Sequence, residues 1–300
     1  MSHSQELMTM TGTKIRIYQL TTLIGAGAFG AIYKGVTGQN SIAIKISLNE
    51  KASKIESDLL RTLHNSGVVP KFYFDTQNGI YHIIGMELMR LDLETLRDKM
   101  PYKTFKKPTL GKLAFQAVHC FKVLHSYNII HRDVKLGNMA ITLPSSSNRQ
   151  VKLRLFDLGL SHVFKDENGN LLDDGRNLDF SECRYAAPDV QMGLDPSPKD
   201  DLVQLSYCII HGSGFDITQK LTLPFDQLLA WKHGLLHNPS DALPGLLKWM
   251  TPWYKDIGLL RDILPINYGS LRMKIQDLME EYDVRADLIL ELEDGEPMLV

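Results

Sequence analysis

The pattern of the sequence changes near residue 90, and this change limits the possible folds more than any other feature. Before it lie short runs rich in β-branched residues, separated by turn sequences at 37–40 and 76–79. One helical stretch, at about 53–64, interrupts these runs. After residue 90 helical patterns dominate, and in the clearest one, 110–124, apolar residues recur on one face. The sequence therefore predicts an α+β fold with a small strand-rich lobe and a larger helical lobe, and a ligand cleft between two such lobes is our default expectation.

Composition narrows the class of protein. The 300 residues can bury a large core without disulfides or a structural metal, and 44% of them are apolar. Lys and Arg number 33 against 35 Asp and Glu, so we expect no nucleic-acid or membrane partner. No apolar run approaches the ~18 residues of a membrane helix, and no secretory signal is visible at the N-terminus. The scattered Cys120, Cys183 and Cys208 favour a reducing compartment. We expect a cytoplasmic monomer, with a nuclear location also open.

A glycine-rich turn lies at 24–33, I-G-A-G-A-F-G-A-I-Y, in which Gly25, Gly27 and Gly30 form G-x-G-x-x-G. Residues without side chains let backbone N–H groups approach phosphate oxygens closely. A dinucleotide fold needs a helix after the glycines, whereas residues 31–36 suit a strand. The G-K-[S/T] of a P-loop is absent. The pattern favours a strand–turn–strand flap over a nucleotide, and an ordinary hairpin turn is the alternative.

A lysine interrupts the apolar strand predicted at 41–46. Buried there, Lys45 would need an anion, such as the α- and β-phosphates of a nucleotide together with a carboxylate. On an edge strand it could instead extend to water. Glu56 is the candidate carboxylate, but it could equally complete a capping box that begins at Ser53. Both alternatives stay open from the residues alone.

The most specific pattern is H-R-D-V-K-L-G-N at 131–138, followed nineteen residues later by an acid at the end of an apolar strand. Phosphoryl transfer explains the set, because that chemistry needs mainly positioning and charge neutralisation. Asp133 can take the proton of an attacking hydroxyl, and Lys135 can neutralise the moving phosphoryl group. Asn138 and Asp157 can supply oxygen ligands to magnesium.

With these motifs, about residues 18–210 resemble eukaryotic protein kinases. Within that superfamily the chain is most similar to the casein kinase 1 group, including tau-tubulin kinases and, more distantly, vaccinia-related kinases. The matching segments are the glycine turn, 54–57, 86–89 with 92–96, 184–186 and 198–202.

The resemblance implies a bilobal kinase fold, ATP as phosphate donor, magnesium as cofactor and proteins as substrates. It implies that the ATP-binding residues are Ile24, Gly25, Gly27, Gly30, Ile32, Lys45, Glu56, Met86, Glu87 and Met89. Among these, Met86 is the expected gatekeeper, and backbone groups of Glu87 and Met89 are expected to meet adenine. The expected lobes are 15–86 and 91–285, joined by a hinge at 87–90, with an extension at 1–14 and an acidic tail at 286–300.

The resemblance also assigns residues of the helical lobe. Asp133 and Lys135 are expected to be catalytic, in the serine/threonine pattern, and Asp201 to brace their loop. Arg132 and Arg184 are expected in the structural and substrate-binding platform. Since Arg184 matches an anion-binding position of the group, acidic or already phosphorylated substrates are expected.

Several positions depart from the group's pattern. Asp157-Leu158-Gly159 replaces D-F-G, and Glu182 stands where the group has a threonine that braces the catalytic acid and lysine. An anion at 182 could bind Lys135 or repel substrate, and the similarity fades beyond residue 210. The alternative to an active kinase is therefore a catalytically impaired, kinase-shaped binding or scaffold module. A nucleotide hydrolase or small-molecule kinase is a third, weaker possibility.

Overall fold

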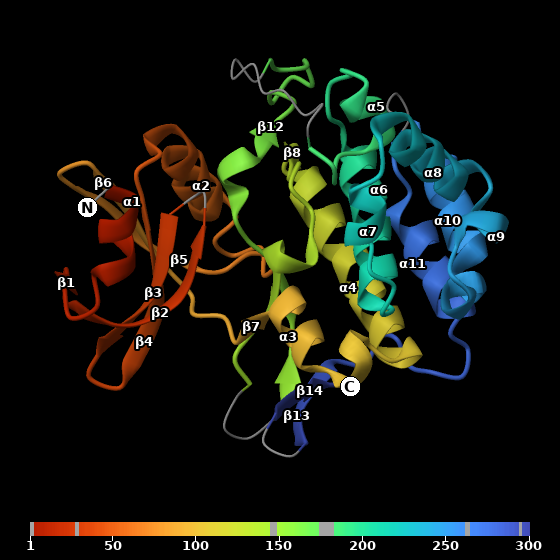
Figure 1. Cartoon of the computed structure of the whole chain (residues 1–300). Coiled ribbons are helices and arrows are strands. Elements are labelled where there is room, and N and C mark those ends of the chain that lie inside the picture. Colours follow the sequence, from red (N-terminus) through yellow and green to blue (C-terminus); the bar gives the residue numbers. More distant parts are fainter. Residues whose placement is uncertain (1–2, 28–29, 145–148, 174–182, 262–264, 294–295) are drawn as a thin grey trace. The chain divides into compact units, whose positions relative to one another are not determined.

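The computed structural model describes residues 3–27, 30–144, 149–173, 183–261, 265–293 and 296–300. The chain forms two compact units, the first comprising residues up to 90 together with 154–161, and the second comprising 91–153 and 162–300. The predicted fold class is confirmed, because a curled antiparallel sheet dominates the N-terminal region and helices dominate the C-terminal region (Figure 1).

The first unit is built on a six-stranded antiparallel sheet in the order β1-β2-β3-β4-β6-β5. Its strands are β1 (Lys14–Ile15), β2 (Tyr18–Gly27), β3 (Gly30–Thr37), β4 (Asn40–Ser47), β5 (Phe72–Asn78) and β6 (Tyr81–Met86). The helix predicted at about 53–64 is α2 (Glu50–Thr62), and it begins where the Asn49 side chain accepts a hydrogen bond from the Ala52 N–H.

One face of this sheet packs into a hydrophobic core, and the other face carries Lys45. Side chains alternate along a strand, so Ile44 and Ile46 share one face of β4 and Lys45 lies on the other. The apolar face is covered by α1 (His3–Glu6) and a 3-10 turn (Leu7–Thr9), whose Leu7 joins the core. The Tyr33 hydroxyl donates to the Leu7 carbonyl at 2.6 Å. Part of the segment 1–14 predicted as an extension is therefore packed into the first unit.

The second unit has long helices at its centre, and α4, α6, α10 and α11 pack against one another. Its helices are α3 (Leu93–Lys99), α4 (Lys107–Ser126), α5 (Pro188–Gln191), α6 (Pro198–Gly212), α7 (Thr218–Leu221), α8 (Phe225–His237), α9 (Pro239–Ala242), α10 (Thr251–Gly258) and α11 (Tyr268–Asp277). Its strands are β7 (Leu91–Asp92), β8 (Ile129–Ile130), β9 (Met139–Ile141), β10 (Gln150–Val151), β12 (His162–Val163), β13 (Leu288–Glu293) and β14 (Glu296–Leu299), while β11 (Leu153–Leu155) leads from this unit into the first.

The C-terminal segment differs from the acidic tail expected at 286–300. β13 and β14 form an antiparallel pair, and β13 also pairs with β10. The Thr109 hydroxyl of α4 donates to the Leu299 carbonyl at 3.2 Å, and Leu299 is buried. The difference is explained by the apolar residues at 288, 290, 298 and 299, which are buried against the second unit. The acidic residues of the tail gave no indication of this burial.

Candidate active site

The first unit brings Lys45, Glu56 and Asp157 together. Lys45 Nζ lies 2.6 Å from Glu56 Oε2 and 2.7 Å from Asp157 Oδ1. β4 is an interior strand between β3 and β6, and only 8% of the Lys45 side chain is exposed, so the edge-strand alternative is wrong. The capping-box alternative is wrong as well, because Asn49 caps α2 and Glu56 lies on its buried face.

Charge pairing decides the state of this lysine. Burial by itself acts to lower the pKa of Lys45, but the charges of Glu56 and Asp157 and their hydrogen bonds raise it above its ordinary value. Lys45 is therefore held as a cation at neutral pH. Asp157 reaches it from a left-handed backbone conformation, with φ 61°, two residues after the end of β11. Aspartate tolerates this region better than most residues, and such strain is typical of functional sites.

The glycine-rich turn is a β-hairpin between β2 and β3, and its tip, residues 28–29, lies outside the described residues. Gly30 has a φ of 120°, and a Cβ there would come within 2.1 Å of the Ile46 carbonyl oxygen, so only glycine fits. A Cβ at Gly25 or Gly27 would meet nothing within 4 Å. Packing within the first unit therefore does not require glycine at these two positions, and their lack of side chains fits the close approach of a nucleotide's phosphates.

The remaining predicted nucleotide residues lie on the same unit. Ile32 pairs directly with Lys45 across β3 and β4, which places both on one face. Ile24 is half exposed on β2. Met86 is buried at the end of β6, and the Glu87 N–H donates to the Lys71 carbonyl at 2.8 Å. The Glu87 carboxylate accepts from the Lys71 N–H, so both bonds fix the start of the predicted hinge without using the Glu87 carbonyl oxygen.

The second unit brings Asp133, Lys135 and Asn138 together. Lys135 Nζ and Asn138 Nδ2 each donate to Asp133 Oδ2 at 2.8 Å. Asn138 Nδ2 also donates to the Asp133 carbonyl at 2.9 Å, which turns the amide oxygen away from the carboxylate. One carboxylate oxygen is thus fixed by two donors, while Asp133 Oδ1 and Asn138 Oδ1 have no bonded partner among the described residues.

Asp201 holds the backbone of this loop, as the resemblance implied. Its Oδ2 accepts from the His131 N–H at 2.7 Å, and its Oδ1 accepts from the Arg132 N–H at 2.8 Å. Arg132 has a φ of 69°, and Asp201 fixes this unfavourable conformation. Burial acts to raise the pKa of Asp201, but the hydrogen bond and charge of His125 and the backbone donors hold it below its usual range.

Three further residues of this network were missed by the sequence analysis. His125 Nε2 lies 2.9 Å from Asp201 Oδ2, and His125 Nδ1 lies 2.5 Å from the Tyr268 hydroxyl. Gln204 accepts from the Val134 N–H at 3.0 Å. Gln204 follows Asp201 by three positions, so it lies on the same face of α6, and this spacing could have revealed it. Nothing local in the sequence marks Tyr268.

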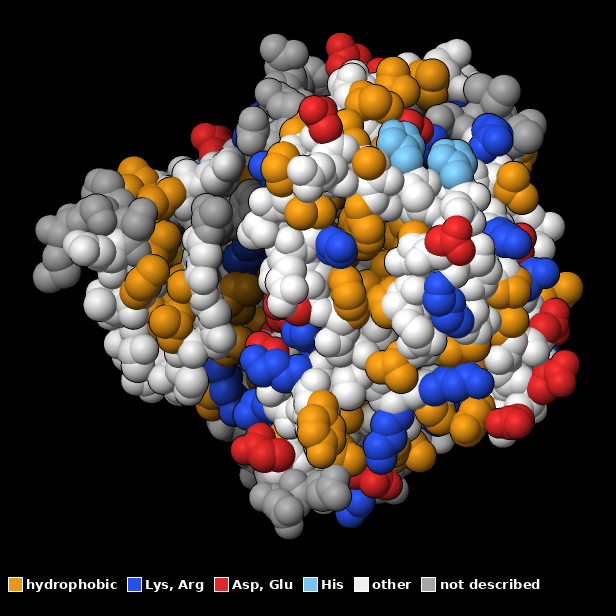
Figure 2. Space-filling model, turned by 45° about the vertical axis from the view of Figure 1, so that its right-hand side comes forward, with side chains coloured by type: hydrophobic (Ala, Val, Ile, Leu, Met, Phe, Trp, Pro, Cys, Tyr) orange, Lys and Arg blue, Asp and Glu red, His pale blue; other side chains and the backbone are white. Residues whose placement is uncertain are grey.

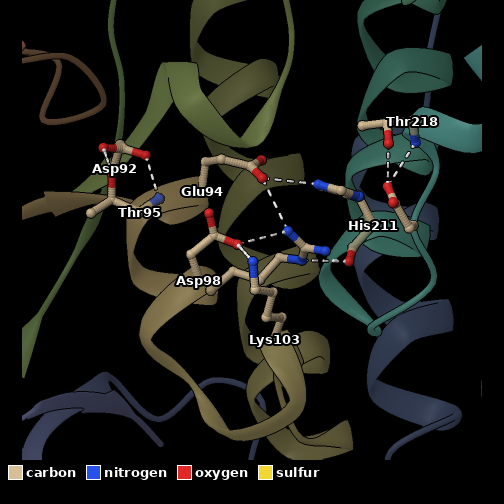
Figure 3. Close-up of polar contacts among 9 residues, drawn as sticks. Asp92, Glu94, Thr95, Asp98, Lys103, His211 and Thr218 are labelled. Carbon is tan, nitrogen blue, oxygen red and sulfur yellow. Dashed lines mark hydrogen bonds and ion pairs between the residues drawn. The ribbon is translucent and has the colours of Figure 1, made fainter.

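The helix that follows the hinge is anchored by polar contacts at its start (Figure 3). Asp92 caps α3 by accepting from the Thr95 N–H at 2.8 Å. Glu94 points toward His211 of α6, and Glu94 Oε1 lies 2.9 Å from His211 Nε2. These bonds connect α3 to the helix that carries Asp201.

The predicted platform residue Arg184 is half buried, and its Nη1 donates to the Leu223 carbonyl at 2.9 Å. Arg132 is buried. Glu182, the position that could impair catalysis, lies outside the described residues. No helix in the described parts of the chain combines the length and apolarity that a membrane crossing requires.

Comparison with known protein families accounts for both clusters. A family model described as the protein kinase domain matches residues 18–205. This is more than half of the 300 residues, and the match runs from the glycine hairpin through Asp201.

Proposed function

Because the chain belongs to the protein kinase family, we propose that it is a serine/threonine protein kinase that transfers the γ-phosphate of ATP to a hydroxyl group of a protein. Protein kinase domains use ATP and Mg²⁺ in general. The casein kinase 1 likeness stays a prediction from the motifs at 24–33, 184–186 and 198–202.

The observation that carries the proposal is the Asp133 carboxylate, with one oxygen fixed by Lys135 and Asn138. In the transfer, a new bond forms between the substrate hydroxyl oxygen and the γ-phosphorus, and the bond from that phosphorus to ADP breaks. Asp133 Oδ1 can accept the hydroxyl hydrogen and finally its proton. Lys135, two positions after Asp133, can neutralise charge on the phosphoryl group, in the pattern of serine and threonine specificity.

The residues of the first unit fit the nucleotide. Lys45, held charged by Glu56 and Asp157, can bind phosphate oxygens. The absence of side chains at Gly25 and Gly27 suits a close approach of other phosphate oxygens to the glycine hairpin. The Asn138 amide oxygen and the Asp157 carboxylate suit a hard cation such as Mg²⁺. When bound, the metal would neutralise phosphate charge and orient the transferred group.

A preference for acidic or phosphorylated substrates rests on local positions, not on the charge of the whole surface. Lys and Arg side chains are interspersed with Asp and Glu on the face shown in Figure 2, in line with the net charge of −2. Arg184 is the residue that supports such a preference. We expect Arg184→Ala to raise KM for an acidic protein substrate and to leave KM for ATP unchanged.

Transfer of labelled phosphate from ATP-Mg²⁺ to casein tests the proposed activity. Asp133→Asn should lower kcat by at least ~100-fold, since it removes the proton acceptor. Asp277→Asn, at an exposed position near the end of α11, is the matched control and should leave kcat unchanged. Equal activity of the Asp133→Asn variant and the wild type would refute the assigned role.

The impaired-module alternative predicts a different result. The wild type would then bind ATP without phosphorylating casein or any other protein offered. Replacing Glu182 with threonine would restore transfer if the anion at that position blocks catalysis. Measurable transfer by the wild type would exclude this alternative.

A further inference from the structure

Lys232, on α8, is buried, and no carboxylate among the described residues is bonded to it. Its exposed fraction is 0%, and its Nζ lies 2.9 Å from the Arg184 carbonyl, 2.6 Å from the Ala186 carbonyl and 2.6 Å from Gln191 Oε1. An ammonium group has three N–H donors, and these three oxygens use all of them. The ring of Tyr207 lies beneath the group, with its centroid 5.4 Å from Nζ.

The segment 184–191 carries its own carboxylate, but this carboxylate pairs with another lysine. Asp189, in the Ala187-Pro188-Asp189 sequence, accepts from Lys199 Nζ at 2.8 Å. Burying a cation among neutral oxygens is costly, so the arrangement needs a compensating gain. The gain lies in the fixed conformation of the segment 184–191. Lys232 bonds to this segment near both of its ends. Gln191 closes the same turn by donating to the Cys183 carbonyl at 3.2 Å.

This segment lies close to the catalytic loop within the second unit. The carbonyls that Lys232 binds belong to the residues on either side of Tyr185. Burial raises the pKa of Tyr185, and the nearby Cys208 and Glu94 add smaller contributions in the same direction. Cys208 Sγ in turn lies 3.7 Å from the Val134 carbonyl, next to Asp133. Tyr185 and the loop that carries Asp133 thus both lie near Cys208.

We infer that Lys232 is a positioning residue that clamps the segment 184–191 in the shape that receives the protein substrate beside Asp133. The inference rests on the proposed function, since it assigns this segment to protein-substrate binding. Lys232 is fully buried, and backbone carbonyls and Gln191 use its three donors, so it is assigned no contact with ATP or with the reacting hydroxyl. Its loss should therefore weaken the use of protein substrate without changing the binding of ATP.

The charges around Lys232 give the clamp a dependence on pH. Burial lowers the pKa of Lys232 to about 7, with the Cys183 thiol opposing the shift and the Arg184 guanidinium adding to it. Tyr207 of α6 stays neutral, because burial raises its pKa well above 10. Above pH 7 the neutral amine of Lys232 has only two N–H donors for the three oxygens of Arg184, Ala186 and Gln191. One of these three hydrogen bonds is then lost.

Further titratable groups lie on the elements around α8, and one of them, the buried Asp200 of α6, accepts from the Ser197 N–H at 2.7 Å. Burial likewise raises the pKa of Tyr254, on α10. Asp189 of α5 bonds to Lys199, as described above, and Asp241 of α9 accepts from Asn238 Nδ2 at 2.6 Å.

Steady-state kinetics of Lys232→Met test the clamp, because methionine keeps the apolar stem and removes the donors. We expect kcat/KM for casein to fall about tenfold, in line with the loss of charge-assisted bonds, and KM for ATP to stay within twofold. Wild-type kcat/KM for casein should decline above pH 7, and the variant should lack this decline. Lys255→Met, at an exposed lysine of α10, is the control and should behave as the wild type.

Hydrogen–deuterium exchange provides a readout that does not need catalysis. In Lys232→Met the amides of 186 and 191–193 should exchange faster, while those of α4 stay protected. Gln191→Leu, which removes one acceptor, should change exchange in the same direction by less, and it serves if the methionine variant does not fold. Unchanged exchange in both variants, or an equal loss of protection throughout the second unit, would overturn the inference. An inactive wild type with faster local exchange in the variants would defeat the proposed function and leave the clamp standing.

Discussion

Two buried lysines, one in each unit, show how neighbouring groups set the state of the same side chain. Lys45 meets two carboxylates, and its pKa is raised. Lys232 meets three neutral oxygens, and burial lowers its pKa to about 7. Both ammonium groups donate to buried oxygens, but only the oxygens around Lys45 carry charge that compensates the cation. The first is thus a permanent cation suited to phosphate, and the second is a donor that can be lost near neutral pH.

The largest effect should come from Lys45→Met. We expect phosphate transfer to fall by at least ~100-fold, because the residue assigned to phosphate binding is lost. The free energy of unfolding should fall by ~3–5 kcal/mol, since Glu56 and Asp157 are left close together without a cation. Enzyme kinetics and urea unfolding measure the two quantities. An unchanged unfolding free energy would contradict the pairing, and Lys255→Met is again the control.

Glu56→Gln should have an intermediate effect. Lys45 would keep Asp157 as its remaining carboxylate, so its pKa should fall but stay high enough for a cation at pH 7. We expect about a tenfold loss of transfer, measured as kcat/KM for ATP. A loss as large as that of Lys45→Met would show that Asp157 by itself cannot hold the lysine.

Gln191→Glu should make the second site resemble the first. A carboxylate within bonding distance of Lys232 would raise the pKa of the lysine. The decline of kcat/KM for casein should then move from about pH 7 to a higher pH by at least ~1 unit. The pH profiles of the wild type and the variant provide the measurement. Coincident profiles would mean that another group causes the decline.

The last comparison concerns stability at alkaline pH. A lysine with a lowered pKa is deprotonated in the folded chain while the unfolded chain still holds its proton, between about pH 7 and 10.5. Stability of the wild type relative to Lys232→Met should therefore rise with pH over this range, while transfer to protein falls. The Lys45 pair has the opposite sign, because its stabilisation is present below pH 10.5 and is lost as the pH rises through its raised pKa. Urea unfolding at pH 6.5 and 9 measures the first trend, and equal differences at both values would contradict it.

The motifs at 24–33 and 131–138 allowed much of the fold and of the site to be predicted, because their chemistry depends on residues close together in the sequence. Asp201 was accessible through the resemblance at 198–202. For Lys45 and Glu56 the sequence allowed two interpretations each. The order of strands in a sheet and the residue that caps a helix depend on tertiary structure, which local sequence does not determine. The position of β4 inside the sheet and the cap at Asn49 decide both.

Other contacts could not be predicted, because they join distant parts of the chain. Tyr268 meets His125 from 143 positions away, and Lys232 meets Arg184 from 48. Neither residue stands in a motif, and a lysine on an amphipathic helix normally suggests an exposed position. The C-terminal strands were missed for a related reason, since their acidic residues gave a stronger signal than the alternating apolar ones.

The covering of the sheet by Leu7 has a practical consequence for protein production. A shortened version of the protein that started at Tyr18 would retain every residue assigned to nucleotide binding. It would also expose Ile44, Ile46 and Tyr33 to solvent, and such a contiguous hydrophobic patch promotes aggregation. Poor solubility of such a version would reflect this missing cover, and boundaries for expression should therefore include the first ten residues.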